Sequence, residues 1–128
     1  MWNEPRQDKL NGLPKLYATE HVDLMDKTIH MHFFILNTDF LICEYDGLDT
    51  FWGFVVLAGD LFNSEWGYIS FSELNSIKIQ GLYEVEHDEY WQVRPAREVK
   101  LICEAQGWNY NKIKNDYVGA SSSMPFMP

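Results

Sequence analysis

Alternation of apolar and polar residues is the clearest pattern in the chain, and it begins in the stretch TIHMHFFI at residues 28–35. Every second residue from Ile29 to Ile35 is apolar. Because successive side chains of a strand point to opposite faces, this period of two predicts a half-buried strand. The other face of that strand carries His30 and His32.

Segments rich in Asn, Asp, Gly and Ser separate this strand from further apolar stretches, and they predict turns at 37–39, 46–49 and 59–64. Strands are then expected at 40–45, 51–57 and 65–71, with part of 82–93 as a candidate fifth. Consecutive strands joined by such short turns pair antiparallel. The predicted fold class is therefore α+β: an antiparallel meander sheet of four to five strands with helices packed on one face.

Two helices are predicted after the meander. Ser70 and Glu73 have the spacing of a capping box, which predicts a short helix at 72–77. The stretch 96–106 has apolar residues at helical spacing and ends before Gly107, which predicts a second helix. We expect one domain over residues 1–107, followed by a C-terminal tail or docking strap at 108–128.

The step Trp-Gly occurs twice, at Trp52-Gly53 and at Trp66-Gly67. A glycine in a strand leaves a gap in the side-chain layer that a neighbouring aromatic ring can cover. We therefore expect both glycines to make room for rings, so that a larger residue at position 67 would overpack the sheet. Trp52, Trp66 and Tyr68 are the candidate aromatic binding residues.

The net charge of −9 is concentrated in the middle of the chain, where residues 16–95 hold fourteen acidic and three basic residues. Such a charge repels a nucleic-acid backbone and favours a protein partner with a basic surface, although it also suits simple solubility. We expect no direct nucleic-acid binding. The candidate acidic patch consists of Asp39, Glu44, Asp46, Asp49, Asp60, Glu84, Glu86, Asp88 and Glu89.

The two cysteines, Cys43 and Cys103, lie far apart and outside any Cys-x-x-Cys pair, which favours a reduced, cytoplasmic protein. No apolar run has the roughly 18 residues that a membrane span needs, so we expect no membrane association. Glycine-rich phosphate loops and nucleophile motifs are also missing. We therefore predict no cofactor and assign no catalytic residue.

His30 and His32 are the weak candidates for metal binding, because their imidazoles are expected on the same face of one strand. Together with a carboxylate such as Glu44, they could hold zinc or iron. The sequence supplies no third ligand at a diagnostic spacing. Two histidines on a semi-exposed polar strand face explain the same pattern.

Three segments carry a family resemblance: LPKLYATE at 13–20, FWGFV at 51–55 and EWGYISFSEL at 65–74. Together they resemble a family of small proteins of bacteria, plasmids and phages that is catalogued only as a domain of unknown function. The similarity runs from about residue 13 to residue 99. It implies a mobile-element setting and no particular reaction.

Two classes of function follow from these observations. The first is a non-enzymatic, acidic interaction protein of phage or mobile-element type, which inhibits a host nucleic-acid-binding defence enzyme through its acidic surface. The alternative is a metal-dependent hydrolase or nuclease that uses His30 and His32.

Overall fold

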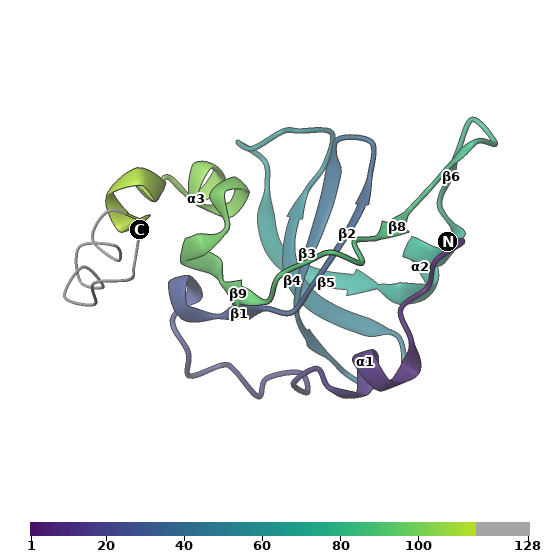
Figure 1. Cartoon of the computed structure of the whole chain (residues 1–128), viewed down its shortest axis with the longest axis horizontal. Helices are drawn as coiled ribbons and strands as arrows, with labels where there is room; N and C mark the ends of the chain where they lie inside the picture. Colours follow the sequence, from purple (N-terminus) through teal and green to yellow (C-terminus); the bar gives the residue numbers. More distant parts are fainter. Residues whose placement is uncertain (115–128) are drawn as a thin grey trace.

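The computed structural model describes residues 1–114 and contains a five-stranded antiparallel sheet with the strand order β5-β4-β3-β2-β8 (Figure 1). The first four strands form a meander, since each pairs with its neighbour in sequence. Their bounds, with that of the fifth strand, are β2 Met31–Ile35, β3 Thr38–Tyr45, β4 Thr50–Val56, β5 Glu65–Ser70 and β8 Glu86–His87. The predicted α+β class with an antiparallel sheet is thus confirmed.

The remaining elements are short and lie around this sheet. Two further strand pairs, β1 with β9 and β6 with β7, are separate from it. The bounds are α1 Gln7–Asn11, η1 Leu24–Asp26, β1 Thr28–Ile29, α2 Phe71–Ser76, β6 Lys78–Ile79, β7 Tyr83–Glu84, β9 Arg94–Pro95, η2 Ala96–Glu98 and α3 Lys100–Gln106. The predicted strand 28–35 is therefore interrupted at His30, where the chain leaves the small β1–β9 pair and enters the main sheet.

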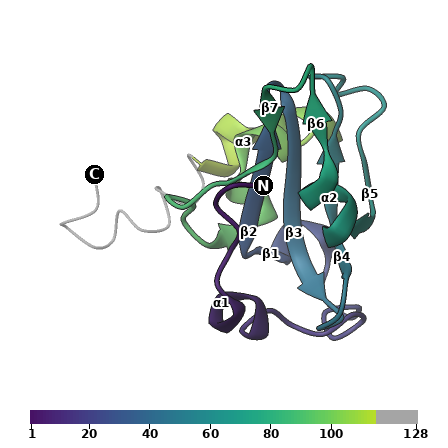
Figure 2. The ribbon, with the colours of Figure 1, turned by 90° about the vertical axis from the view of Figure 1, so that its right-hand side faces the viewer.

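The two faces of the sheet carry separate apolar clusters. The first includes Phe33 and Phe51 and receives Leu10 from α1 and Leu74 from α2. The second includes residues of β3 and β4 and receives Ile102 from α3. Figures 1 and 2 show α2 and α3 on opposite sides of the sheet.

The expectation that helices pack on one face is therefore wrong. Strand β3 is buried without interruption from Phe40 to Tyr45, so it presents apolar side chains to both faces. Each face must then be covered to remove those side chains from water.

Both predicted helices are present, the first shifted by one residue and the second divided into a 3₁₀ turn and an α-helix. At the start of α2, the Ser70 side chain accepts a hydrogen bond from the Glu73 backbone N–H at 3.2 Å. The second helix begins as the 3₁₀ turn η2 and continues as α3, which ends at Gly107 in the left-handed conformation (φ 73°). Trp108, expected in the tail, packs against the second cluster, and residues 115–128 of that tail lie outside the described residues.

The two Trp-Gly steps do not have the predicted role. A Cβ atom at Gly53 would lie 2.0 Å from the Leu41 carbonyl oxygen, so this glycine makes room for backbone and not for a ring. At Gly67 a Cβ atom would meet no described atom within 4 Å. The two tryptophans stack on each other instead, with ring centroids of Trp52 and Trp66 5.3 Å apart and ring planes inclined by 15°. The expected overpacking at Gly67 is therefore contradicted.

Candidate functional site

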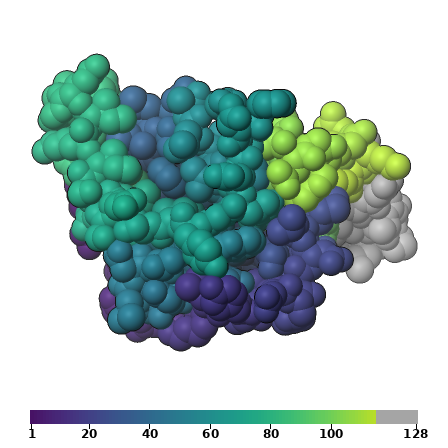
Figure 3. All heavy atoms as spheres, turned by 180° about the vertical axis from the view of Figure 1, so that it is seen from behind, coloured from purple at the N-terminus to yellow at the C-terminus, as the bar shows by residue number. Residues whose placement is uncertain are grey.

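A pocket of about 450 Å³ opens where the N-terminal segment crosses the second face of the sheet. One wall comes from residues 17–24 and the other from Glu44 of β3 and Trp52 of β4, with Lys27 between them. Figure 3 shows this side of the molecule, where the purple-to-blue N-terminal segment lies against the teal strands. We call it the Glu44 pocket.

A β-bulge places Glu44 in this pocket. The pairing of β3 with β4 shifts by one residue between Ile42 and Glu44, after which Glu44 lies opposite Trp52. In a regular strand the period of two would turn Glu44 toward the first cluster. The bulge is the reason that alternation alone did not predict this site.

Glu44 is only 4% exposed, and its carboxylate accepts hydrogen bonds from three donors. It accepts the backbone N–H groups of Tyr17 at 2.9 Å and Thr19 at 3.2 Å, and the Thr19 hydroxyl also donates to it. Tyr17 has a left-handed backbone (φ 69°), a conformation that costs on the order of 1 kcal/mol for a residue with a side chain. The hydrogen bonds to Glu44 offset that cost and hold the crossing segment on the sheet.

Lys27 is the second buried charge of the pocket, with 6% of its surface exposed. Its ammonium donates to the Thr19 backbone carbonyl and, at 3.1 Å, to the Thr19 hydroxyl. It also lies 5.2 Å from the centre of the Trp52 ring, within the range of a cation–π interaction. The Thr19 hydroxyl thus links the two opposite charges, accepting from Lys27 and donating to Glu44.

Sequence reasoning did not select Thr19 or Lys27. One feature of the sequence distinguishes Lys27: it is one of only three basic residues between positions 16 and 95. A buried charge needs a partner, and here Lys27 has Thr19 and the Trp52 ring.

The three candidate aromatic residues meet at the rim of the Glu44 pocket. Trp52 and Tyr68 are paired across β4 and β5, and Trp66 stacks on Trp52. The hydroxyl of Tyr68 lies 2.8 Å from that of Tyr17. That hydrogen bond, with partial desolvation and the charges of Glu44 and Glu20, raises the pKa of the Tyr68 phenol. Tyr17 and Tyr68 remain 62% and 59% exposed, so they form an outward-facing pair.

Several candidate acids have local structural partners. Asp46 accepts the backbone N–H groups of Leu48, Asp49 and Thr50, and these bonds lower its pKa. Asp49 accepts from Ser70 and Ser72, which lowers its pKa and ties the β3–β4 turn to α2. Asp60 accepts from Asn63, with the same effect on its pKa.

The nine candidate acids are divided among several parts of the molecule. Asp46 and Asp49 lie in the β3–β4 turn, whereas Asp39 pairs with Val56 at the opposite end of β4. Asp60 follows that same end of β4. Glu84, Glu86, Asp88 and Glu89 lie in and beside β7 and β8, where Glu84 pairs with the Met1 ammonium at 2.8 Å. Glu44 is buried, so it is not part of an exposed acidic surface.

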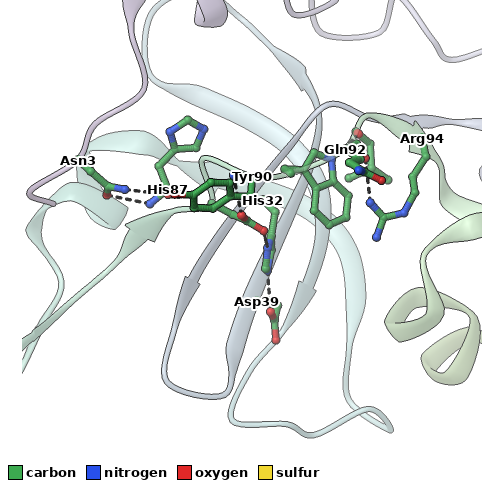
Figure 4. Close-up of polar contacts among 10 residues, drawn as sticks. Asn3, His32, Asp39, His87, Tyr90, Gln92 and Arg94 are labelled. Carbon is green, nitrogen blue, oxygen red and sulfur yellow. Dashed lines mark hydrogen bonds and ion pairs between the residues drawn. The ribbon is translucent and has the colours of Figure 1, made fainter.

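His32 binds two of these acids (Figure 4). Its Nδ1 atom lies 2.9 Å from Asp88 Oδ2, and its Nε2 atom lies 2.7 Å from Asp39 Oδ1. Burial lowers the pKa of His32, but the hydrogen bonds and charges of the two carboxylates outweigh burial and raise it overall. His32 therefore joins β2 to β3 and to the segment after β8.

The candidate metal ligands His30, His32 and Glu44 do not come together in the structure. Both nitrogens of His32 are engaged by aspartates, and Glu44 is held by Tyr17 and Thr19. His30 lines a different pocket, together with His87. Within residues 1–114, no group of three or more His, Cys, Asp or Glu side chains has the geometry to hold a metal ion.

Comparisons of the chain with protein-family models, curated proteins and solved structures found no match. The family resemblance therefore stays a prediction from the motifs. In the structure, the motif segments 13–20, 51–55 and 65–74 meet at the Glu44 pocket through Tyr17, Trp52 and Tyr68. Among residues 1–114, no helix has the length and apolarity that crossing a membrane requires.

Proposed function

We propose that this protein is a non-enzymatic interaction protein whose partner binds over the rim of the Glu44 pocket. The observation that carries the proposal is the exposed Tyr17–Tyr68 pair above a rigid base, the Trp52–Trp66 stack. Tyrosine and tryptophan are enriched at the energetic centres of protein interfaces, where a held ring loses little conformational freedom on binding.

The charges at this rim favour a basic partner. Glu20 and Asp23 are exposed in the pocket wall, whereas the buried Lys27 and Glu44 are linked to each other through Thr19. The charges left to a partner are therefore carboxylates. An arginine or lysine of the partner, placed between these carboxylates and the Tyr17 ring, would gain both ionic and cation–π contacts.

In its sharper form, the proposal makes the partner a host nucleic-acid-binding defence enzyme in the cytoplasm, inhibited because this protein covers its basic groove. Support for this form comes from the net charge and from the mobile-element setting implied by the family resemblance. The proposed contact is the tyrosine rim with Glu20 and Asp23, because the other acids are dispersed or engaged locally.

The test is capture of host proteins by the immobilised chain in three forms: wild type, Tyr17→Ser/Tyr68→Ser, and Tyr90→Ser. Tyr90 is a matched control because it is 91% exposed and lies outside the Glu44 pocket. The proposal is supported if wild type and Tyr90→Ser capture the same partner and the double variant does not. Salt should also weaken the binding of that partner. Capture that the double variant retains would overturn it.

A second arm tests the sharper form. Duplex DNA or single-stranded RNA is added to the captured complex at constant ionic strength. Release of the partner indicates that nucleic acid and this protein compete for one basic surface. If capture is lost in the double variant but nucleic acid does not release the partner, the interaction at the tyrosine rim stands. The mimicry of a nucleic-acid backbone is then rejected.

A further inference from the structure

A second pocket, of about 230 Å³, lies at the β8 edge of the sheet. Lys9 and Leu13 from the α1 region line one side, and His87 and Trp91 line the other. His30 and Met31, at the start of β2, also contribute. Few ligands larger than a small metabolite fit in such a volume. We call it the His87 pocket.

His87 is a buried polar side chain without a hydrogen-bond partner for its ring among residues 1–114. Only 7% of the residue is exposed, and the ring packs 5.6 Å from that of Phe33. Asn3 fixes the His87 backbone, accepting its N–H at 3.0 Å and donating to its carbonyl at 2.8 Å. Figure 4 shows the imidazole pointing away from the His32–Asp39 pair.

The ring nitrogens of His87 are not sealed in the core. Among the described residues, every fully inaccessible side-chain nitrogen or oxygen has a hydrogen-bond partner. The unpartnered nitrogens of His87 must therefore be accessible, and the pocket that His87 lines is the space available to them. Because the rest of His87 is buried and Asn3 fixes its backbone, a ligand in the pocket meets an imidazole that is already held in place.

The other unpartnered groups of the pocket are also nitrogen groups. The His30 ring makes no hydrogen bond, and Lys9 makes no ion pair, within the described part of the chain. The two carboxylates that face the pocket already have partners: Asp8 binds Arg6 at 2.8 Å, and Asp88 binds His32 at 2.9 Å. Two imidazoles and one ammonium are thus left for a ligand.

The charge on these groups follows from their surroundings. Burial lowers the pKa of His30. Burial also lowers the pKa of His87; the Lys9 and His32 charges act in the same direction, and Glu89 and Asp88 oppose them. Both rings therefore favour the neutral form near pH 7, in which each has one N–H to donate. An anion bound in the pocket would accept these N–H groups and favour uptake of a proton.

We propose that the His87 pocket binds a small monocarboxylic acid. Its carboxylate accepts hydrogen bonds from the imidazoles of His30 and His87 and from the Lys9 ammonium. Its short apolar chain lies against Leu13, Met31 and Trp91. The indole N–H of Trp91 already donates to the Ile29 carbonyl at 2.9 Å, so that ring offers the ligand only an apolar surface.

This site is separate from the tyrosine rim, and its test needs no partner protein. Butyrate, the uncharged butyramide and inorganic phosphate are titrated into the full chain, and the carbon-bound ring protons of the histidines are followed by NMR. Butyrate is expected to shift the His30 and His87 signals saturably, with a dissociation constant on the order of 1 mM. Its affinity should rise when the pH falls from about 7.5 to about 6, because binding takes up protons.

Two variants and one control locate the ligand. Lys9→Gln changes an exposed side chain and should weaken butyrate binding about fivefold or more, while Lys15→Gln, an exposed lysine outside the pocket, should leave it unchanged. His87→Phe keeps a ring against Phe33 but has no nitrogen, and it should abolish the saturable shift at His30.

Three results would overturn the proposal. The first is a shift that does not saturate, or that butyramide reproduces. The second is binding of phosphate but not of butyrate, which would make the pocket a phosphate site. The third is stoichiometric binding of zinc by His30 and His87 with no response to butyrate, because the pair would then be a metal site.

Discussion

The central strands β3 and β4 differ from the edge strands β5 and β8 in how completely their groups are used. In the centre, residues 40–45 of β3 are all buried, and the carboxylate of Glu44 among them accepts hydrogen bonds from three donors. At the edges, Tyr68 of β5 is more than half exposed, and the ring of the buried His87 of β8 has no hydrogen-bond partner among residues 1–114. The central strands specify the fold, while the sheet side chains left available to ligands and partners, Tyr68 and His87, lie on the edge strands.

The largest effect expected from this contrast is at the two paired glycines, Gly53 in the centre and Gly67 on the edge. Gly53→Ala places a Cβ atom 2.0 Å from backbone and should destabilise the fold by roughly 3 kcal/mol or more. Gly67→Ala meets open space and should be neutral or stabilise by up to about 1 kcal/mol. Urea unfolding of both variants measures the difference. Equal losses would show that β5 is packed as tightly as β4.

A second contrast uses two glutamates. Glu44→Gln puts amide hydrogens against the donors of Thr19 and removes the charge opposite Lys27, so we expect a loss of about 2–3 kcal/mol. Glu65→Gln, on the exposed edge of β5, should change stability by less than about 0.5 kcal/mol. Chemical denaturation compares them, and a similar effect at the two positions would contradict the central role of Glu44.

At the end of β5, Ser70→Ala removes the acceptor for the Glu73 N–H and the donor to Asp49. A lost helix cap costs about 1 kcal/mol. Ser76→Ala, at the other end of α2, is the control, because its hydroxyl only donates to the Glu73 carbonyl. The thermal midpoint should fall clearly for Ser70→Ala alone. No difference between the two variants would mean that the cap contributes little.

The smallest effect concerns His32, which ties the segment after β8 to the central strands. Its folded pKa lies above the ordinary value of 6.5, so folding favours the protonated ring. This contribution is fully present below pH 6.5 and is lost as the pH rises through the raised pKa. The stability advantage of wild type over His32→Asn should therefore shrink between about pH 6 and about pH 8.

His21→Asn is the control for that measurement, because the His21 side chain is exposed and makes no ion pair in the described residues. Its stability should follow that of the wild type at each pH. If the stability advantage of wild type over His32→Asn stays constant with pH, His32 acts by packing on Phe34 and Trp91 and not through its charge.

Most of the sheet could be predicted from the sequence, because local rules determine it. The period of two in residues 31–35 and the turn residues near positions 37 and 46 specify a meander without reference to distant parts of the chain. The cap at Ser70 is equally local. The faces that the helices cover were not predictable in this way, because they depend on the burial of β3 from both sides.

The candidate sites were harder to predict, because they depend on contacts between distant segments. Thr19 meets Glu44 only because a bulge turns that carboxylate toward the crossing segment. His32 was a weak metal candidate in the sequence, and its partner Asp88 lies far along the chain, where no local pattern connects the two. Trp52 and Tyr68 were candidates from the sequence, and they lie together because they share one face of neighbouring strands.

The strand order has a further consequence for the order of folding. Strands β2 to β5 are joined by hairpins between sequence neighbours, whereas β1–β9, β2–β8 and the Asn3–His87 contacts join segments far apart in the chain. Short loops close faster than long ones, so the hairpins form first and the two chain-closing pairs last. In native-state hydrogen exchange, amides of β8 and β9 should open locally, while those of β3 and β4 should exchange only when the whole domain unfolds.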